Sequence, residues 1–205
     1  MNLKDTINEI LLPIKLIIPQ PIIRRIPGLT TNEDIRINKV LDFIRRDMNC
    51  LDIGCGNNRL IHMHIKRGGL GTGVDIYSWQ GADLVLDDTS SLPFSDKSFD
   101  CITFVASLNH IVNRKMVLKE SRRVLKDDGI VIITFLTPSI STLWHKISFW
   151  DRDQHQRGMK KGEIYGFSHG EISLLLEQTE FKVIRRERFS WGLNNIYVCK
   201  KAKSS

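Results

Sequence analysis

Residues 49–59 read NCLDIGCGNNR, and this stretch decides the fold. It opens with a short apolar run around Asp52, which predicts a buried strand. Gly54 and Gly56 follow at once and allow a sharp turn, because glycine adopts backbone conformations that a β-carbon hinders. Asn58 is the second of two asparagines that we expect to cap the helix that follows. A strand, a glycine turn and a helix N-terminus in succession are typical of a nucleotide-cofactor site in an α/β protein.

The glycine pattern by itself leaves two cofactor classes open. A dinucleotide fingerprint, G-x-G-x-x-G, has a third glycine that packs the helix on the strand. Arg59 occupies that position here. The carboxylate of Asp52, shortly before the first glycine, is a poor neighbour for pyrophosphate and suits a cation or an ammonium group better. The pattern therefore disfavours a nicotinamide cofactor.

Further motifs follow the glycine turn in a fixed order. Residues 71–76, GTGVDI, predict a second strand ending in Asp75, which is placed to bond both hydroxyls of a ribose. The D-x-x-x-L-P-F motif of residues 88–94 and the S-F-D motif of residues 98–100 come next. Together with the D-x-G-x-G turn, these motifs resemble the class I S-adenosylmethionine-dependent methyltransferases of the small "type 11" kind. The resemblance is strong over residues 49–135 and looser beyond them.

The resemblance implies S-adenosyl-L-methionine as the cofactor and a binding residue for each of its parts. Asp52 and the two glycines are implied at the methionine end, and Asp75 at the ribose. Asp88 and the backbone of Thr89 are implied at the adenine edge. The alternative for Asp75 and Asp88 is that they only cap strand ends. The implied cofactor-binding residues are Asp52, Gly54, Gly56, Asp75, Ile76, Asp88, Thr89 and Ala106.

The expected fold class is α/β: a Rossmann-like, doubly wound, mostly parallel seven-stranded sheet with its last strand antiparallel. Only six residues separate Asp75 from the next expected strand, so the crossover helix usual in the family is shortened or missing. Further strands are predicted over 82–86, 101–106, 129–136, 181–189 and 195–201. Helices are predicted over 59–67, 114–126 and 168–178, the last capped by Ser168 with Glu171.

Two sections flank this pattern. Residues 1–29 alternate bulky aliphatic residues with prolines and are expected to form a lid, part of the core or a membrane-interface segment. Residues 30–205 are the expected methyltransferase domain, whose first helix is capped by Thr31. Within it, residues 137–167 are an irregular insertion on the acceptor side. It contains Trp144, His145, Trp150, Asp151, Asp153, His155, Arg157 and Tyr165.

Composition narrows the class of partner. The chain has 205 residues, enough for one well-packed α/β domain, and a formal net charge of +7. Residues 144–205 carry 12 basic and 7 acidic side chains, so most of the excess is C-terminal. We interpret this excess as a solvated surface, in preference to a site for an acidic acceptor, a nucleic acid or an anionic membrane, since no aromatic-interleaved RNA motif accompanies it. The oligomeric state is left open.

Cysteine usage and targeting signals point to the cytoplasm. The four cysteines form no C-x-x-C pair and are expected to be reduced core thiols, without a metal site or a disulfide framework. The sequence shows no secretory signal and no apolar run of membrane-spanning length. We expect a cytoplasmic protein, with peripheral contact at the inner membrane face through residues 1–29 as the alternative.

A histidine is the expected catalytic base. Methyl transfer requires the nucleophile to be aligned and water excluded, and a hydroxyl acceptor must also lose its proton. His110 follows the fourth expected strand, at the edge where parallel sheets bind ligands, and is the first candidate. His145, His155 and His169 are the next candidates. The alternate spacing of acidic residues and His155 in the insertion is a weak indication of a metal, and no metal is expected.

The acceptor is predicted from the content of the insertion. Aromatic faces with carboxylates and a few cations suit a saccharide or another small hydroxylated metabolite, so O-methylation of such a glycan or small molecule is expected. The alternatives are methylation of a lipid or quinone precursor, a non-catalytic protein that binds S-adenosylmethionine, and a nicotinamide oxidoreductase. A nucleic-acid acceptor is not favoured.

Overall fold

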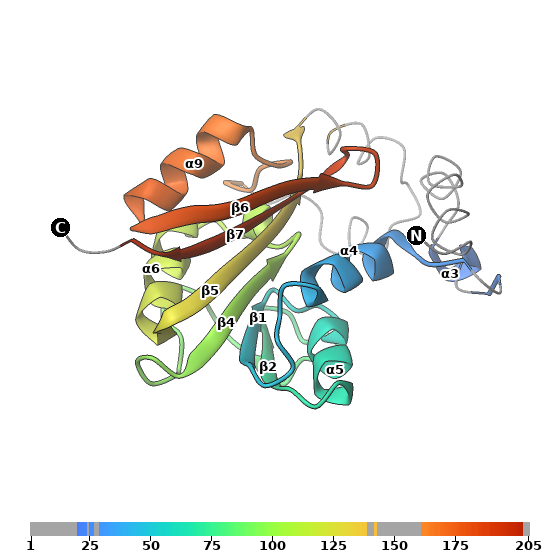
Figure 1. The fold of residues 1–205 in the computed structure, drawn as a ribbon, viewed down its shortest axis with the longest axis horizontal. Coiled ribbons are helices and arrows are strands. Elements are labelled where there is room, and N and C mark those ends of the chain that lie inside the picture. The colour runs from blue at the N-terminus through green and yellow to red at the C-terminus, as the bar shows by residue number, and fades with distance from the viewer. Residues whose placement is uncertain (1–19, 24, 27–28, 139–141, 143–160, 203–205) are drawn as a thin grey trace.

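The computed structural model describes residues 20–23, 25–26, 29–138, 142 and 161–202 (Figure 1). Most of the predicted N-terminal section and residues 139–141 and 143–160 of the insertion lie outside this range, so the predictions made for them are not tested. Their candidates His145 and His155 are among those residues. The short helix α3 (Gln20–Ile23) belongs to the N-terminal section. Among the described residues, no helix combines the length and the apolar character needed to cross a bilayer.

One seven-stranded sheet organises the domain, in the order β3-β2-β1-β4-β5-β7-β6 (Figure 1). The pairs β1–β2, β1–β4, β2–β3 and β4–β5 are parallel, whereas β7 is antiparallel to both β5 and β6. This confirms the predicted α/β class with its antiparallel last strand. The strands are β1 (Asn49–Ile53), β2 (Leu70–Asp75), β3 (Leu84–Val85), β4 (Phe99–Val105), β5 (Leu125–Leu136), β6 (Phe181–Phe189) and β7 (Asn194–Lys201).

The helices begin at the predicted caps. Thr31 forms a capping box with Asp34, and Ser168 forms one with Glu171. In each box, both side chains accept hydrogen bonds from backbone N–H groups at the start of the helix that have no partner within the helix. The helix after the glycine turn starts at Arg59, as predicted. The helices are α4 (Asn32–Leu41), α5 (Arg59–Lys66), α6 (Arg114–Val124) and α9 (His169–Gln178), with a 3-10 turn, η1 (Leu108–His110).

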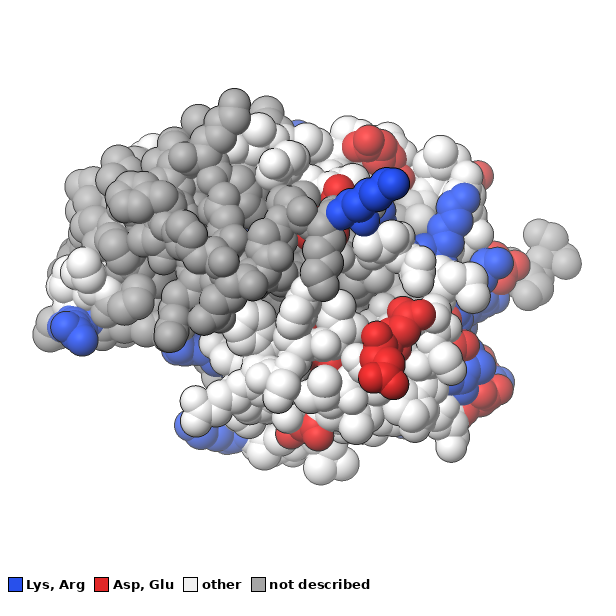
Figure 2. Space-filling view, turned by 180° about the vertical axis from the view of Figure 1, so that it is seen from behind, with Lys and Arg blue, Asp and Glu red and all other residues white. Residues whose placement is uncertain are grey.

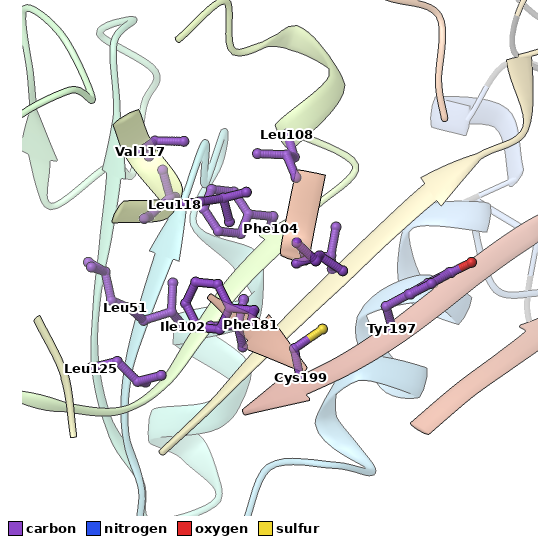
Figure 3. Packing of buried hydrophobic residues seen from close by; sticks show 14 of the residues in the cluster. Leu51, Ile102, Phe104, Leu108, Val117, Leu118, Leu125, Phe181, Tyr197 and Cys199 are labelled. Atoms are coloured by element: carbon purple, nitrogen blue, oxygen red, sulfur yellow. The ribbon is translucent and has the colours of Figure 1, made fainter. Parts of the chain in front are cut away.

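Two apolar layers hold these helices on opposite faces of the sheet. Alternate residues of a strand point to opposite faces, so Ile132 and Ile133 of β5 enter different clusters. One cluster joins α4 and α5 to the sheet through residues such as Val40. The other joins α6 and α9 to the sheet; Figure 3 shows Leu108, Phe104 and other members of it. Apolar residues therefore cover both faces of the central strands, and polar groups can gather at the sheet's carboxyl edge.

Several predicted bounds differ from the structure by one or two residues, and two strands differ in a way that their hydrogen bonds explain. The strand expected over 82–86 is only Leu84–Val85, although the chain stays hydrogen-bonded to β2 on either side of it. The N–H of Asp83 donates to the carbonyl of Gly73 (3.0 Å), and that of Leu86 to the carbonyl of Asp75 (2.8 Å). The strand expected from residue 129 begins at Leu125, because Leu125 already pairs with β4, at Phe99, before a register shift.

A polar clamp stands where the family's crossover helix was expected to be short or absent. Residues 76–83 contain no helix. Asp83 instead accepts hydrogen bonds from the Nδ2 of Asn58 (2.7 Å) and the N–H of Gly73 (2.8 Å). Asn58 does occupy the N-cap position of α5, but its side chain makes this contact and no capping bond. Capping by a side chain was therefore wrong for Asn58 and confirmed for the other predicted asparagine, Asn57, whose Oδ1 accepts a hydrogen bond from the N–H of Arg59 (3.1 Å).

Charged side chains on the described surface are largely interspersed. On the right-hand side of the face that Figure 2 shows, Lys and Arg side chains lie beside Asp and Glu side chains. Glu187 pairs with Lys39 (2.6 Å) and Arg185 (2.5 Å), and Lys201 pairs with Asp127 (3.3 Å). Part of the C-terminal basic excess thus has acidic partners within the domain, as a solvated surface would.

The clamp predicts that Gly73→Ala destabilises the fold. A β-carbon at residue 73 would collide with the side-chain amide of Asn58, which is fully buried and held by Asp83. We expect a loss of roughly 1–3 kcal/mol in the free energy of unfolding, measured by urea denaturation. Gly170→Ala in α9 is the control, because a β-carbon there meets nothing within 4 Å and alanine favours a helix. Equal stability of the two variants would contradict the clamp.

Candidate functional site

The carboxyl edge of the sheet gathers the polar residues that follow its central strands. The register places Asp52 of β1 beside Gly73 of β2 on one side and Thr103 of β4 on the other. Parallel strands end at the same edge, so the turns after these three strands lie together. This is where the sequence places its candidate residues, and the structure brings Asp52, the glycine turn and Asp75 together.

Backbone hydrogen bonds join the glycine turn to β2. The carbonyl of Val74 accepts from the N–H of Gly54 (2.9 Å) and of Cys55 (3.1 Å). Gly54 has a φ of 75°, and a β-carbon there would collide with Ser107, whose hydroxyl donates to the carbonyl of Ile53 (2.5 Å). Gly56 has a φ of 52°, and its absent β-carbon would face open space. The first glycine allows close packing of β1 on β4, and the second leaves room beside bare backbone.

Asp75 holds the turn in this shape. Its Oδ2 accepts a hydrogen bond from the N–H of Gly56 (2.9 Å), and its Oδ1 accepts one from the N–H of Tyr77 (3.0 Å). A carboxylate offers about four acceptor positions, so each oxygen can take a further donor such as a ribose hydroxyl. Asp75 is 7% exposed, and the next residue, Ile76, is an exposed apolar side chain. The ribose role of Asp75 stays a prediction that this geometry permits.

Asp52 lies beneath the turn, almost out of contact with water. It is 2% exposed, and its Oδ1 accepts a hydrogen bond from the hydroxyl of Thr103 (2.6 Å). Burial raises the pKa of Asp52 to about 7, with a smaller contribution from the charge of Asp75; the Thr103 bond acts in the opposite direction. A cation near the carboxylate would favour its ionised form. The site therefore suits an ammonium or another positive group, as its position in the sequence predicts.

The remaining predicted residues lie at neighbouring strand ends. Asp88, beyond β3, is exposed and accepts a hydrogen bond from the N–H of Ser90 (3.0 Å), and bonding to Ser90 lowers its pKa. Thr89 beside it is buried. Ala106, after β4, has a φ of 55°, and its N–H donates to the carbonyl and the hydroxyl of Thr134, both at 3.1 Å. Positive φ at a residue with a β-carbon is strained, and such strain is concentrated at functional sites. The cofactor contacts of these residues stay predictions.

His110 lies on η1 at the same edge, and it has a partner that the sequence analysis missed. Its Nδ1 is 3.2 Å from the Oε2 of Glu163, in the described end of the insertion. The fourth candidate, His169, is in α9 and contacts the hydroxyl of Tyr197 (2.7 Å). Glu163 is 53 positions from His110, so no local pattern pairs the two. The only signal in the sequence was the position of both residues on the acceptor side.

The structure bears on the predictions made for the cysteines and for a metal site. All four cysteines are buried and free, and burial raises the pKa of Cys199 to about 12. Neutral buried thiols are poor nucleophiles. Within the described ranges, no three His, Cys, Asp or Glu side chains are grouped so as to hold a metal ion.

Comparison with known proteins gives the family. A family model described as "Methyltransferase domain" matches residues 51–133. A demethylmenaquinone methyltransferase of Thermotoga maritima is 33% identical over 97 residues, which are 45% of this chain and 42% of that protein. The chain spans about a third to a half of the length of the first curated relatives that it matches. The predicted resemblance is confirmed: residues 51–133 are a methyltransferase domain of the S-adenosylmethionine-dependent type.

Solved structures share the fold. A S-adenosylmethionine-dependent methyltransferase of Methanosarcina mazei has a TM-score of 0.61 at 22% identity, over 81% of this chain and 98% of that one. The 1,6-didemethyltoxoflavin-N1-methyltransferase of Burkholderia thailandensis, solved with its substrate and S-adenosylhomocysteine, has a TM-score of 0.62 at 15% identity, over 83% and 78%. At these identities the likeness is one of fold. It agrees with S-adenosylmethionine as the cofactor of this domain.

The buried carboxyl generates a prediction about stability and pH. The folded-state pKa of Asp52 lies above the unfolded value, so folding favours the protonated form and the stability it contributes is lost as the pH rises toward 7. Asp52→Asn keeps an acceptor for Thr103 and removes this loss. We expect the variant's gain in unfolding free energy to be about 2–3 kcal/mol larger at pH 8 than at pH 5, by urea denaturation. The exposed Asp87→Asn is the control, and an Asp52→Asn effect independent of pH would contradict the argument.

Proposed function

We propose that this chain, whose residues 51–133 are a methyltransferase domain, is an enzyme that uses S-adenosyl-L-methionine to methylate a hydroxyl group of a saccharide or a related small metabolite. One observation carries the proposal. A cradle of bare backbone and two carboxylates lies at the carboxyl edge of the sheet, and a histidine paired with a buried glutamate lies at the same edge. The first element suits the cofactor, and the second suits an acceptor that must lose a proton.

The residues of the cradle fit the cofactor part by part. Open space beside Gly56 leaves room for a ligand against the main chain. The buried Asp52 matches the positive charge of the methionine end, and Asp75 keeps acceptor positions for ribose hydroxyls. The site has no third glycine and offers carboxylates where a dinucleotide would place its pyrophosphate. These features support S-adenosylmethionine over NAD.

The chemistry asks little of the protein beyond position and proton transfer. The bound cofactor supplies a methyl group on a positively charged sulfur, which needs no further activation. The protein holds the acceptor oxygen in line with that methyl group and excludes water, and alignment of this kind contributes roughly 7–11 kcal/mol in favourable cases. As the acceptor oxygen gains the methyl group, His110 takes the hydroxyl proton and later passes it to water.

The choice of acceptor rests on fewer observations. A histidine base favours oxygen over carbon as the atom methylated, and the aromatic and acidic residues of the insertion favour a saccharide. The relative from T. maritima is named for a quinone precursor, and this observation favours a quinone or lipid acceptor as the second candidate. A quinone or a lipid acceptor would lie at a membrane, which would agree with a membrane-interface role of residues 1–29. A binding protein without activity is the remaining alternative.

The cofactor claim is tested by titration. We expect the full chain to bind S-adenosylhomocysteine and not NAD in isothermal titration calorimetry. Asp75→Asn keeps one acceptor oxygen for the backbone but loses charge, so we expect roughly 10- to 100-fold weaker S-adenosylhomocysteine binding. Asp87→Asn, an exposed neighbour in sequence of Asp88, is the matched control and should bind normally. Binding of NAD alone would overturn the cofactor assignment.

The acceptor claim is tested by transfer of a tritiated methyl group. The screen covers nucleotide sugars, lipid-linked oligosaccharides, quinone precursors, sterols and tRNA, with the full chain. We expect label in a saccharide, and we expect His110→Ala to lose roughly 100-fold or more in turnover while S-adenosylhomocysteine affinity changes little. Label in a quinone precursor or tRNA alone would refute the saccharide and leave the methyltransferase activity standing. A larger loss of affinity than of turnover would make His110 a binding residue.

A further inference from the structure

We propose that Glu163 is a positioning residue that fixes the orientation and the proton of His110. With the proton held on Nδ1, the Nε2 nitrogen carries the lone pair and is the one that accepts a proton from the acceptor hydroxyl. This inference rests on the proposed function for its purpose. The hydrogen bond itself is a property of the folded chain and can be measured without any acceptor.

Burial and distance set the direction of this hydrogen bond. The Nδ1 of His110 and the Oε2 of Glu163 are 3.2 Å apart, with side chains 19% and 2% exposed respectively. An ionised carboxylate only accepts hydrogen bonds, so the imidazole must be the donor. This contact therefore favours the Nδ1–H form of the ring. The same carboxylate stabilises the imidazolium once His110 has taken a second proton.

The backbone around Glu163 is held in place on both sides of that residue. The N–H of Ile164 donates to the carbonyl of Asn109 (3.0 Å), and the amide of Asn109 donates back to the carbonyl of Ile164 (3.3 Å). Asn109 is buried and precedes His110 in η1. Asn109 and Ile164 are thus hydrogen-bonded to each other. His110 follows the first of them in sequence, and Glu163 precedes the second. This arrangement limits the movement of Glu163 relative to His110.

Arg114 closes the arrangement and balances its charge. Its Nη2 donates to the carbonyls of Asn109 (3.0 Å) and Gly162 (2.8 Å), and its guanidinium lies 6.0 Å from the centre of the Phe167 ring. Burial lowers the pKa of Arg114, and the nearby Glu163 carboxylate opposes this shift. Arg114 thus brings a positive charge near the carboxylate that contacts His110. Four segments, η1, the start of α6, residues 162–164 and Phe167, therefore meet at this point.

The arrangement links the insertion to the histidine. The insertion leaves the sheet after β5 and returns through residues 161–167, where Glu163 lies. This returning segment has no regular secondary structure and includes the contact with His110. A change in the insertion that moves Glu163 would remove its contact with the Nδ1 of His110, whereas the cofactor cradle, on β1 and β2, would keep its own hydrogen bonds. We therefore expect substitutions at Glu163 to affect turnover far more than cofactor binding.

The tautomer of His110 is the first measurement. Nitrogen NMR of the full chain labelled at histidine, with the His110 signals assigned by their loss in His110→Ala, distinguishes a protonated from a bare ring nitrogen. We expect protonated Nδ1 and bare Nε2 in the unaltered protein. Glu163→Gln retains an acceptor oxygen and should keep this state, and Glu163→Ala should lose it. The exposed Glu177→Ala in α9 is the matched control and should leave the signals unchanged.

Two results would overturn the proposal. One is a protonated Nε2 with a bare Nδ1 in the unaltered protein, a result that needs no variant to fold. The other is a Glu163→Ala protein that folds and shows unchanged ring nitrogens for His110. Either result would leave the proposed methyltransferase activity untouched.

Kinetics supply the second measurement, with the acceptor found in the methyl-transfer screen. We expect Glu163→Ala to lower kcat by roughly 10- to 100-fold with little change in the KM for S-adenosylmethionine, and Glu163→Gln to restore much of the loss. If Glu163 acts through His110, adding Glu163→Ala to His110→Ala costs no further activity. Full additivity of the two losses would assign Glu163 an independent role. Absence of methyl transfer with every acceptor would count against the proposed function, and the tautomer would still decide the positioning role.

Discussion

The hydrogen bond from the N–H of Gly56 to the carboxylate of Asp75 connects the two strand ends at which the cofactor site is proposed. It joins the turn after β1 to the end of β2, and a second bond from the N–H of Tyr77 fixes the other oxygen. Charge-assisted hydrogen bonds to backbone amides are stronger than neutral ones, so the carboxylate can hold the turn in its left-handed conformation. A β-carbon at Gly56 would face open space, so the same bond also positions the stretch of main chain beside which a ligand has room. One residue thus serves the fold and the cradle together.

Some groups of the site lower the stability of the fold, and packing on the sheet offsets this loss. Burial of Asp52 raises its pKa to about 7, and Ala106 adopts a left-handed conformation at the end of β4. Both features are unfavourable by themselves and are held by the surrounding structure. The apolar layers on the two faces of the sheet, which include Val40 and Phe104, provide that structure. Asp52 and Ala106 thus place a buried carboxyl group and a left-handed residue at the carboxyl edge, where the cofactor site is proposed.

Under the proposed function, the cofactor and the acceptor contact different parts of the chain. The family match ends at residue 133, before the insertion that approaches His110. Relatives and fold neighbours of this domain are named for acceptors as unlike as a menaquinone precursor and a toxoflavin precursor. A shared cradle with differing acceptors is expected when specificity lies in segments grafted on the common fold. In this chain residues 161–167, with Glu163, are the described portion of the insertion for which we propose such a role.

The sequence by itself determined the features that depend on near neighbours. The strand, glycine turn and helix of residues 49–59, the capping boxes of Thr31 and Ser168 and the C-terminal hairpin follow from local hydrogen bonding and periodicity, and the structure has them. Tertiary structure alone decided that Asn58 bonds Asp83 and that Glu163 meets His110. These partners are distant in the chain, and their contact depends on which strands pair and how the loops return. Local pattern fixes backbone conformation, whereas the partner of a buried polar group is chosen only when the sheet has closed around it.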